Sequence, residues 1–263
     1  MSDMDGMDGM GDMYGMDGLD GMRLDGRAAV ITGGAGAIGA AIAADLAALG
    51  ARVVLGDVDL PGAERVAAGL PGARAAALDL TDPESVAAFA RAAGDVDVLV
   101  HNAGVAVIGP FTESDPASWD LMWQVNLRGP MLLTKLLLPG MTARGWGRLV
   151  FVSSDGARAG SGGEGAYAAT KAGLFGLAKT LAREAARGRV TSNVVCPGPT
   201  DTPMLRRVAA AEPGLVDRIA RGIPLRRLGV PADVSGLVAF LCTERAAYIT
   251  GQTLSVSGGV TMH

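Results

Sequence analysis

Residues 28–39 read AAVITGGAGAIG, and this stretch decides the fold. The run AAVIT (28–32) is short and apolar, as a buried strand is, and an alanine-rich helical pattern begins at Ile38. Glycines between a strand and a helix let the backbone approach a pyrophosphate at the positive end of the helix. The stretch therefore predicts a dinucleotide site, although an ordinary glycine-rich turn is the alternative. The predicted contacts are Gly33, Gly36, Ala37, Ile38 and Gly39.

The alternation of strand and helix continues to the end of the chain. Strands separated by helices of 10–15 residues form right-handed βαβ units and a parallel sheet. We expect an α/β, Rossmann-like doubly wound sheet of about seven strands with helices on both faces. Predicted strands cover 28–32, 51–57, 73–79, 96–102, 147–154, 188–198 and 251–259, and predicted helices include 38–49, 61–69 and 83–93.

Residues 1–22 differ from the rest of the chain. They hold seven Met, six Gly and six Asp but no Lys or Arg, and such a composition cannot build a core. We predict a disordered tail whose residues 1–21 are dispensable for activity. No linker follows Met22, so residues 23–263 are predicted to form one domain.

Bulk composition excludes several classes of protein. The chain has 263 residues, 49% of them hydrophobic, and a net charge of −4 that the six tail aspartates more than account for. Neither sign of charge argues for nucleic acid. No apolar stretch is long enough to span a membrane and no secretory signal is present, so we expect a cytoplasmic protein. Cys196 and Cys242 lack metal-ligand spacing, and we predict that both are reduced, buried thiols. Because the chain has only two histidines, no metal site is predicted.

Acidic residues follow the second and third predicted strands. Asp57 can accept hydrogen bonds from the ribose hydroxyls of adenosine and would repel a 2′-phosphate, which favours NAD over NADP. Alternatively, Asp57 caps the next helix, or Asp59 is the relevant acid. Asp79 can meet the adenine amino group, or it can serve as a cap or turn residue. The flanking Val58 and Leu80 are also predicted contacts.

The fourth predicted strand ends in His101-Asn102-Ala103-Gly104, beside the expected cofactor. Asn102, Ala103 and Gly104 are predicted to contact it. A histidine on an apolar strand is more often a structural residue than a catalyst, so we predict a structural role for His101.

Ser154, Tyr167 and Lys171 form the candidate catalytic group. Tyr167 and Lys171 lie four residues apart, so they share one face of a helix. Ser154 lies at the end of a predicted buried strand. A hydroxyl, a phenol and an ammonium can thus converge at the carboxyl end of a strand, where they can move a proton on or off an alcohol oxygen.

Together these pieces resemble the classical short-chain dehydrogenase/reductase family over residues 23–263. Thr32–Gly39 is similar to the family's glycine motif and His101–Gly104 to its Asn-Asn-Ala-Gly motif. Ala37 replaces the usual middle glycine, and His101 replaces the first asparagine. The resemblance implies Asn126, in VNLRG, as a fourth catalytic residue beside Ser154, Tyr167 and Lys171. It further implies cofactor contacts at Tyr167, Lys171, Pro197, Gly198, Thr200 and Thr202.

The predicted chemistry is the interconversion of a secondary alcohol and a ketone with NAD. Tyr167 would exchange the proton of the substrate oxygen, with its pKa lowered by the Lys171 ammonium and the nicotinamide cation. Ser154 would hold that oxygen. The resemblance implies that Lys171 also binds the nicotinamide ribose and that Asn126 holds a water. The alternatives are an NADPH-dependent 3-oxoacyl carrier-protein reductase and a non-catalytic dinucleotide-sensing protein.

A substrate lid is predicted at about 199–228, where proline and glycine punctuate short helical pieces. Its arginines suggest an anionic substrate, such as a carboxylate or an acyl-CoA thioester, although a solvated basic face is the alternative. They are Arg206, Arg207, Arg218, Arg221, Arg226 and Arg227, against Glu212 and Asp217. The run CPGPTDTPM and the ending LSVSGGVTMH resemble those of family members that act on alicyclic hydroxyacyl-CoA compounds, which implies a cyclic hydroxyacid or hydroxyacyl-CoA. Relatives of the family are usually tetramers, and small residues of the helix after Tyr167 are consistent with a homotetramer. They are Ala168, Ala169, Ala172, Gly173 and Gly176.

Overall fold

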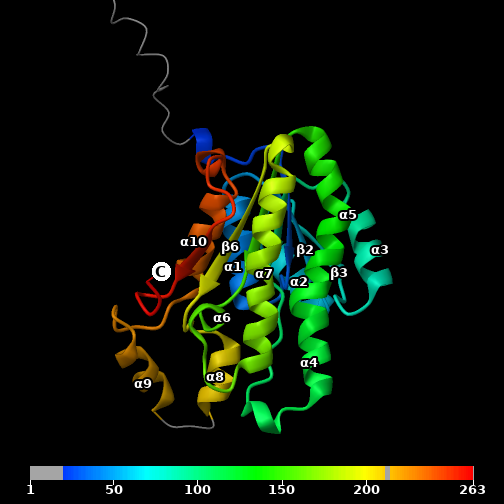
Figure 1. The fold of residues 1–263 in the computed structure, drawn as a ribbon. Coiled ribbons are helices and arrows are strands. Elements are labelled where there is room, and N and C mark those ends of the chain that lie inside the picture. Colours follow the sequence, from blue (N-terminus) through cyan, green and yellow to red (C-terminus); the bar gives the residue numbers. More distant parts are fainter. Residues whose placement is uncertain (1–19, 211–213, 263) are drawn as a thin grey trace, which may run out of the picture.

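A single seven-stranded parallel sheet organises the chain (Figure 1), as seen in a computed structural model that describes residues 20–210 and 214–262. The strand order is β3-β2-β1-β4-β5-β6-β7. The predicted Rossmann-like α/β fold is confirmed. The strands are β1 (Ala28–Thr32), β2 (Arg52–Asp57), β3 (Arg74–Ala77), β4 (Val98–His101), β5 (Gly147–Val152), β6 (Val190–Pro197) and β7 (Thr253–Val256).

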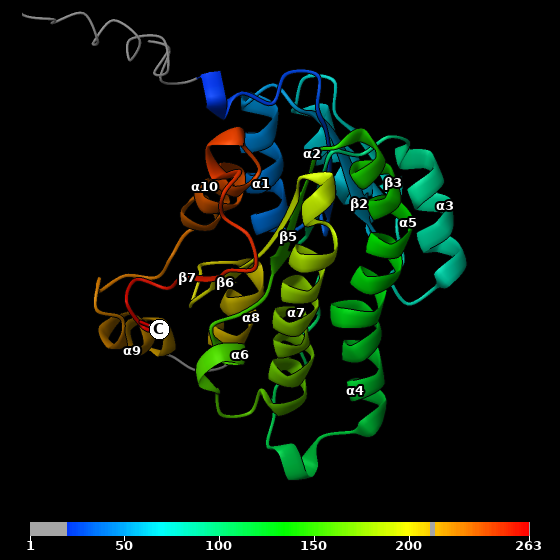
Figure 2. The same cartoon turned by 45° about the horizontal axis from the view of Figure 1, so that its top comes forward.

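Two layers of helices cover the sheet (Figures 1 and 2). One hydrophobic cluster joins the sheet to α1 (Ala37–Ala48), α2 (Leu60–Ala68) and α10 (Pro231–Leu241). The other cluster joins it to α3 (Pro83–Ala93), α5 (Gly129–Arg144) and α7 (Gly165–Glu184). Because both faces are covered, the central strands are apolar throughout, and all five residues of β1 are buried.

Shorter elements complete the described chain. Four are helices, α4 (Pro116–Trp123), α6 (Gly156–Ala159), α8 (Pro203–Ala210) and α9 (Leu215–Gly222), and a π-helical turn covers Gln124–Arg128. Turns of 3-10 helix cover Asp20–Met22, Phe111–Glu113, Ala186–Gly188 and Glu244–Ala246. The predicted tail falls mostly on residues 1–19, which lie outside the described residues. Among the residues that are described, no helix is long and apolar enough to cross a membrane.

Most predicted strands extended one or more residues too far. The strand predicted at 147–154 ends at Val152, and the strand predicted at 73–79 ends at Ala77. In both cases the polar residues after the strand bond within the following turn. Ser154 accepts from the backbone N–H of Gly156, and Asp79 accepts from that of Thr81. Such local side-chain bonds compete with the strand ladder and end it.

The sheet order creates a crevice where β1 lies between β2 and β4. Thr32, the last residue of β1, pairs with Gly56 on one side and His101 on the other. On the two sides of this point, α1 covers one face of the sheet and α5 covers the other. In open parallel sheets, ligands bind outside the carboxyl ends of the strands at such a switch point.

Candidate active site

The glycine-rich turn between β1 and α1 is tight because its own backbone atoms approach one another. Gly33 has a φ of 71°, in the left-handed region that favours glycine. A Cβ on Gly39 would lie 2.1 Å from the carbonyl oxygen of Gly33, and one on Gly36 would lie 3.3 Å from it. Glycine at position 39 is therefore required by the turn itself.

The N-terminus of α1 carries no side-chain cap. Its N-cap residue is Gly36, whereas α2, α3 and α4 begin with Asp59, Asp82 and Asp115, each of which accepts a backbone N–H. The first N–H groups of α1, at Ala37, Ile38 and Gly39, are thus not bonded by a side-chain cap. This donor set fits the phosphates of a dinucleotide. It also includes Ala37, at which the helix begins.

Asn102 joins the glycine-rich turn to the loop after β4. Its side-chain amide donates to the carbonyl oxygens of Thr32 and Gly33, each at 3.1 Å. The Thr32 hydroxyl in turn accepts from the backbone N–H groups of Asn102 and Ala103. This bracing role of Thr32 was not predicted, although a threonine that ends a strand is a recognisable signal for one. These bonds fix the two loops on either side of the crevice.

Asp57 and Asp59 have different roles. Asp59 caps α2 by accepting the backbone N–H of Gly62, so it takes the cap role that was the alternative for Asp57. The Asp57 carboxylate lies at the crevice and accepts from the backbone N–H groups of Ala35 (2.9 Å) and Asp59 (3.0 Å). Val58, between them, is 77% exposed. Asp57 is therefore the acid that closes the glycine-rich turn.

The residues after β3 take turn and core positions. Asp79 accepts from both the backbone N–H and the hydroxyl of Thr81, and the cap of α3 is Asp82. The turn alternative for Asp79 is thus observed and the cap alternative is not. The Leu80 side chain is buried in the core against α5, where a Cβ on Gly129 would lie 2.7 Å from the Leu80 Cβ. Any contact of Leu80 with a ligand would have to come from its backbone.

Ser154, Tyr167 and Lys171 converge beside the end of β5. The Ser154 side chain lies close enough to Tyr167 to lower the pKa of the Tyr167 phenol. Lys171, one turn later on α7, is buried, and its ammonium donates to the carbonyl oxygen of Val152 at 2.9 Å. A Cβ on Gly104 would lie 2.8 Å from the Lys171 Nζ, so the loop after β4 passes close to this ammonium.

Asn126 is buried in the π-helical turn and bonds to two other segments. Its side-chain oxygen accepts from the backbone N–H of Val105, and its amide donates to the Val105 carbonyl oxygen and the Thr170 hydroxyl. Thr170 in turn donates to the carbonyl oxygen of Tyr167. Asn126 thus links the loop after β4 to the turn of α7 that carries Tyr167. π-Helical turns are frequent at functional sites.

The pKa values at this site differ from the expected lowering of Tyr167. Burial, with the Glu164 carboxylate as a second cause, raises the pKa of Tyr167 to about 12 against the opposing Ser154 hydrogen bond. Burial lowers the pKa of Lys171 to about 8. Burial is the largest cause of both shifts, and the Lys171 ammonium is directed at the Val152 carbonyl oxygen.

His101 has the structural role expected of it. It is buried, its Nε2 lies 2.8 Å from the Thr134 hydroxyl, and its ring stacks on Phe151 at 4.9 Å. Burial, with a further contribution from the Lys171 charge, lowers the pKa of His101 to about 3, so the imidazole is neutral at physiological pH. Cys196 and Cys242 are free and buried, as expected.

The two ends of the segment predicted as a lid lie side by side. Thr200 bridges Gly229, and the Gly229 N–H donates to the carbonyl oxygen of Pro199. At its base, the Gly198 N–H donates to the Val256 carbonyl oxygen in β7, and Thr202 precedes α8, where its hydroxyl accepts from the Leu205 N–H. The excursion carries α8 and α9 beside the carboxyl edge of the sheet (Figure 1). Pro197 ends β6, so these predicted contact residues lie at one edge of the sheet.

Two arginines of this segment are paired within the chain. Arg206 binds both carboxylate oxygens of Asp201, and Arg227 binds both of Asp233. Arg226 donates to the carbonyl oxygen of Arg221. The side chain of Arg207 and the residue Glu212 lie outside the described residues. The paired arginines favour the alternative that this basic face is structural rather than a binding site for an anion.

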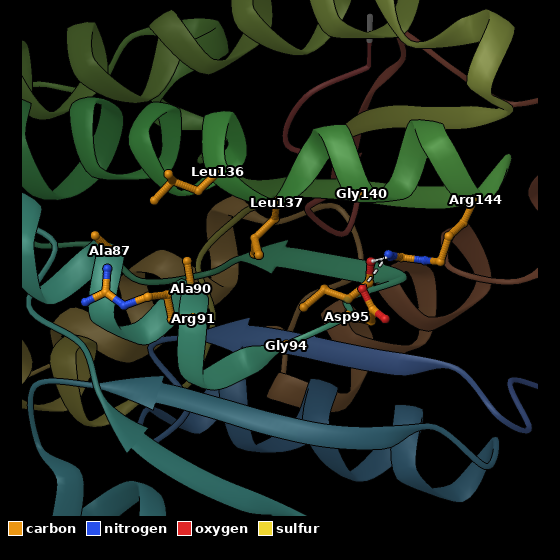
Figure 3. A pocket seen from close by; sticks show the side chains of 10 residues that line it. Ala87, Ala90, Arg91, Gly94, Asp95, Leu136, Leu137, Gly140 and Arg144 are labelled. Carbon is orange, nitrogen blue, oxygen red and sulfur yellow. Dashed lines mark hydrogen bonds and ion pairs between the residues drawn. The ribbon is translucent and has the colours of Figure 1, made fainter.

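A pocket of about 370 Å³ lies elsewhere, between α3 and α5 (Figure 3). Its lining includes Gly94, Asp95 and Val96, which precede β4, so it opens at the amino-terminal edge of the sheet. Arg144 pairs with Asp95 at its rim, at 2.8 Å. None of the predicted site residues lines it.

Comparisons with known proteins agree with this arrangement. A sequence model of the family described as enoyl-(acyl carrier protein) reductase matches residues 33–261. The chain is 40% identical over 248 residues to a 2,3-dihydroxy-2,3-dihydro-p-cumate dehydrogenase of Pseudomonas putida, which covers 91% of this chain and 96% of that protein. It is 37% identical over 246 residues to the 3-oxoacyl-[acyl-carrier-protein] reductase FabG of Escherichia coli, over 92% of this chain and all of that protein.

A solved structure shares both fold and sequence. The gluconate 5-dehydrogenase of Burkholderia cenocepacia, in complex with NADP and tartrate, superposes with a TM-score of 0.85 at 30% identity. The match covers 92% of this chain and 98% of that chain. The chain thus has a parallel sheet with an uncapped glycine turn at its switch point, and relatives match it over nearly its whole length. It is a member of the short-chain dehydrogenase/reductase family of oxidoreductases.

Proposed function

We propose that the chain is an NAD-dependent oxidoreductase that interconverts a secondary alcohol and a ketone by hydride transfer. The observation that carries the proposal is that the Ser154 and Tyr167 side chains lie next to one another and beside the buried Lys171 ammonium. A substrate oxygen placed against both hydroxyls can be held by one and can exchange its proton with the other. Catalytic roles are proposed for Asn126, Ser154, Tyr167 and Lys171.

In oxidation, Tyr167 as phenolate accepts the proton of the substrate hydroxyl through its Oη while the adjacent carbon loses hydride. Ser154 keeps the substrate oxygen in place by hydrogen bonding. A bound nicotinamide dinucleotide supplies the hydride acceptor, and its positive ring in the oxidised form favours the phenolate. In reduction, Tyr167 as phenol donates the proton to the carbonyl oxygen.

Lys171 and Asn126 act around Tyr167. The Lys171 ammonium is held at a fixed position by the Val152 carbonyl oxygen, from which its charge favours the phenolate electrostatically. Asn126 fixes the α7 turn through Thr170. We also propose that Lys171 binds the nicotinamide ribose.

We propose NAD over NADP because of Asp57. Its carboxylate lies beside the uncapped start of α1 and its charge would repel a 2′-phosphate. The gluconate 5-dehydrogenase noted above binds NADP, so family membership alone does not decide the cofactor. The remaining proposed contacts are Gly33, Gly36, Ala37, Ile38, Gly39, Val58, Asp79, Leu80, Asn102, Ala103, Gly104, Pro197, Gly198, Thr200 and Thr202.

A second candidate is NADPH-dependent reduction of a 3-oxoacyl carrier protein. The full-length match to the Escherichia coli reductase favours it, and the charge of Asp57 disfavours it. For either activity we propose a cytoplasmic homotetramer built from a single domain of residues 23–263 with a lid at 199–228. Titration with both dinucleotides distinguishes the two candidates.

Substitution of Tyr167 tests the proposal. Tyr167→Phe removes the proton-transfer group and leaves the aromatic ring, so turnover is expected to fall about 100-fold or more while the dissociation constant of the dinucleotide stays within threefold. Initial rates and fluorescence titration measure the two quantities. Tyr248→Phe is the matched control, because Tyr248 is fully exposed. Turnover by Tyr167→Phe at close to the wild-type rate would contradict the mechanism.

A further inference from the structure

Glu164 is a carboxylic acid next to the proposed catalytic residues, with no role in the proposed proton transfer. It lies three residues before Tyr167, at the N-cap position of α7. Its side chain makes no cap hydrogen bond with the helix, although it is half-buried and lies beside Ser161. Burial raises the pKa of this carboxyl, and its charge raises the pKa of Tyr167. A half-buried carboxyl near a reactive phenol needs an explanation.

Gly156 lies between Glu164 and Ser154. A Cβ placed on Gly156 would lie 2.4 Å from the Glu164 Oε2 and 3.4 Å from the Ser154 Oγ. A side chain at position 156 would therefore clash with the carboxyl, and glycine lets the Glu164 carboxyl approach Ser154. A substrate whose oxygen contacts Ser154 and Tyr167 would place its neighbouring atoms within reach of this carboxyl.

Apolar side chains lie beside the two residues that flank Glu164. A Cβ on Gly163 would lie 3.2 Å from the Ile108 Cγ2, and one on Gly165 would lie 2.9 Å from the Phe111 Cδ2. Ile108 is 51% exposed and Phe111 is 60% exposed, which leaves apolar surface next to this segment. The segment thus combines the Glu164 carboxyl with neighbouring apolar side chains. This combination suits a ligand with an apolar body and a polar substituent.

The chemistry of Glu164 selects among polar substituents. A carboxylate repels an anionic group, and the paired arginines Arg206 and Arg227 leave little reason to expect one. A hydroxyl can donate to the ionised carboxyl or accept from the protonated one, so it suits a half-buried acid in both states. An ammonium suits only the ionised state, which burial disfavours.

We propose that Glu164 is a specificity-determining residue that recognises a second hydroxyl on the carbon next to the one oxidised. The preferred substrates are vicinal diols with an apolar ring or chain. Ser154 and Tyr167 hold the reacting oxygen, Glu164 holds its neighbour, and Ile108 and Phe111 contact the apolar part. This inference rests on the proposed alcohol oxidation and names its substrate class.

The test compares cyclohexanol with its vicinal cis-diol. The wild type is expected to have the higher kcat/KM for the diol, and Glu164→Ala is expected to reduce the ratio of diol to monoalcohol by about 10- to 100-fold, the usual effect of losing a hydrogen bond to a charged group. Glu164→Gln restores part of the ratio because its amide still bonds a hydroxyl. Glu184→Ala, at the other end of α7, is the matched control and leaves the ratio unchanged.

A binding measurement separates specificity from folding. With dinucleotide present, the diol is expected to raise the Tm of the wild type more than that of Glu164→Ala. A ratio that Glu164→Ala leaves unchanged, or a wild type that prefers cyclohexanol or the matching amino alcohol to the diol, overturns this inference and leaves the proposed function intact. If the wild type oxidises none of these alcohols with either dinucleotide, the proposed function fails with it.

Discussion

At the scale of single residues, Asp57 and Asp59 have the same side chain but different hydrogen-bonding roles because of their positions. Both were candidates for the ribose-binding acid. Asp59 caps α2 by accepting the Gly62 N–H, whereas the Asp57 carboxylate closes the glycine-rich turn by accepting the Ala35 N–H. A carboxylate oxygen can accept more than one hydrogen bond, so the bond to Ala35 leaves Asp57 able to accept from ribose hydroxyls as well.

Asp57→Asn is expected to change the cofactor preference. The amide keeps an acceptor for the Ala35 N–H but loses the charge that repels a 2′-phosphate. The ratio of kcat/KM with NAD to kcat/KM with NADP is expected to fall about 10-fold or more, since hydrogen bonds to charged groups contribute about 1.5–3 kcal/mol. Asp59→Asn makes the same chemical change two residues later and retains a good cap, so its ratio is expected to match the wild type. An unchanged ratio in Asp57→Asn would remove the argument for NAD.

The roles of these residues were only partly predictable from sequence. The spacing of Tyr167 and Lys171 fixed their common helix face, because four residues make about one turn. Their pKa values were not predictable in the same way, since they depend on burial by segments distant in the chain. The expected lowering of the Tyr167 pKa was based on the nearby Lys171 charge and left out burial, which is the largest cause of the observed rise. Glu164 was missed because a lone acid at the start of a helix is usually a dipole or cap residue.

At the scale of elements, α7 combines an inner and an outer surface. Gly173 faces into the chain, where a Cβ would lie 2.5 Å from Leu127, so its small size serves the fold. Gly176 is exposed and has no atom within 4 Å of a Cβ. Of the small residues predicted to allow close approach of a second copy, Gly176 is thus one whose size this chain alone does not require.

Gly176→Ala therefore tests the proposed homotetramer. If α7 packs closely against a second copy, the added methyl is expected to shift the sedimentation coefficient toward that of a smaller species. Gly236→Ala is the matched control, because Gly236 is an exposed glycine of α10 with open space around it. Its helix should gain about 1 kcal/mol from the better propensity of alanine. A Gly176→Ala protein that sediments as the wild type would argue against assembly through this surface.

The types of the elements could be predicted from the sequence. The residues at which they end, and the π-helical turn, were harder to predict. Apolar runs and glycine turns mark the seven strands because a sheet covered on both faces needs apolar residues throughout. Asn126 could be named from the resemblance, but its bonds to Val105 and Thr170 join residues 21 and 44 positions away. Contacts of that separation arise from the tertiary fold and leave no local pattern.

At the scale of the whole molecule, His101 connects stability to pH. The folded chain holds its imidazole neutral, with a pKa of about 3 against 6.5 in the unfolded chain. Between these values the unfolded state binds more protons, so this group's contribution to stability is complete above pH 6.5 and is lost as the pH falls toward 3. Within this window the loss is about 1.4 kcal/mol per pH unit.

His101→Gln is expected to remove this dependence. Glutamine can still bond to the Thr134 hydroxyl but does not titrate, so the free energy of unfolding should fall less steeply with acid than in the wild type. The difference in slope between the two proteins should be about 1.4 kcal/mol per pH unit. Urea unfolding at a series of pH values measures both slopes. Equal slopes would show that His101 is not the group responsible.

The strand order also affects how the chain is made. β1, β2 and β3 leave the ribosome first and can pair with one another, but the second edge of β1 remains open until β4, at residues 98–101, has been synthesised. An open edge of a buried, apolar strand is a template for pairing with other chains. The interval between the synthesis of β3 and that of β4 is therefore one in which the nascent protein is exposed to aggregation.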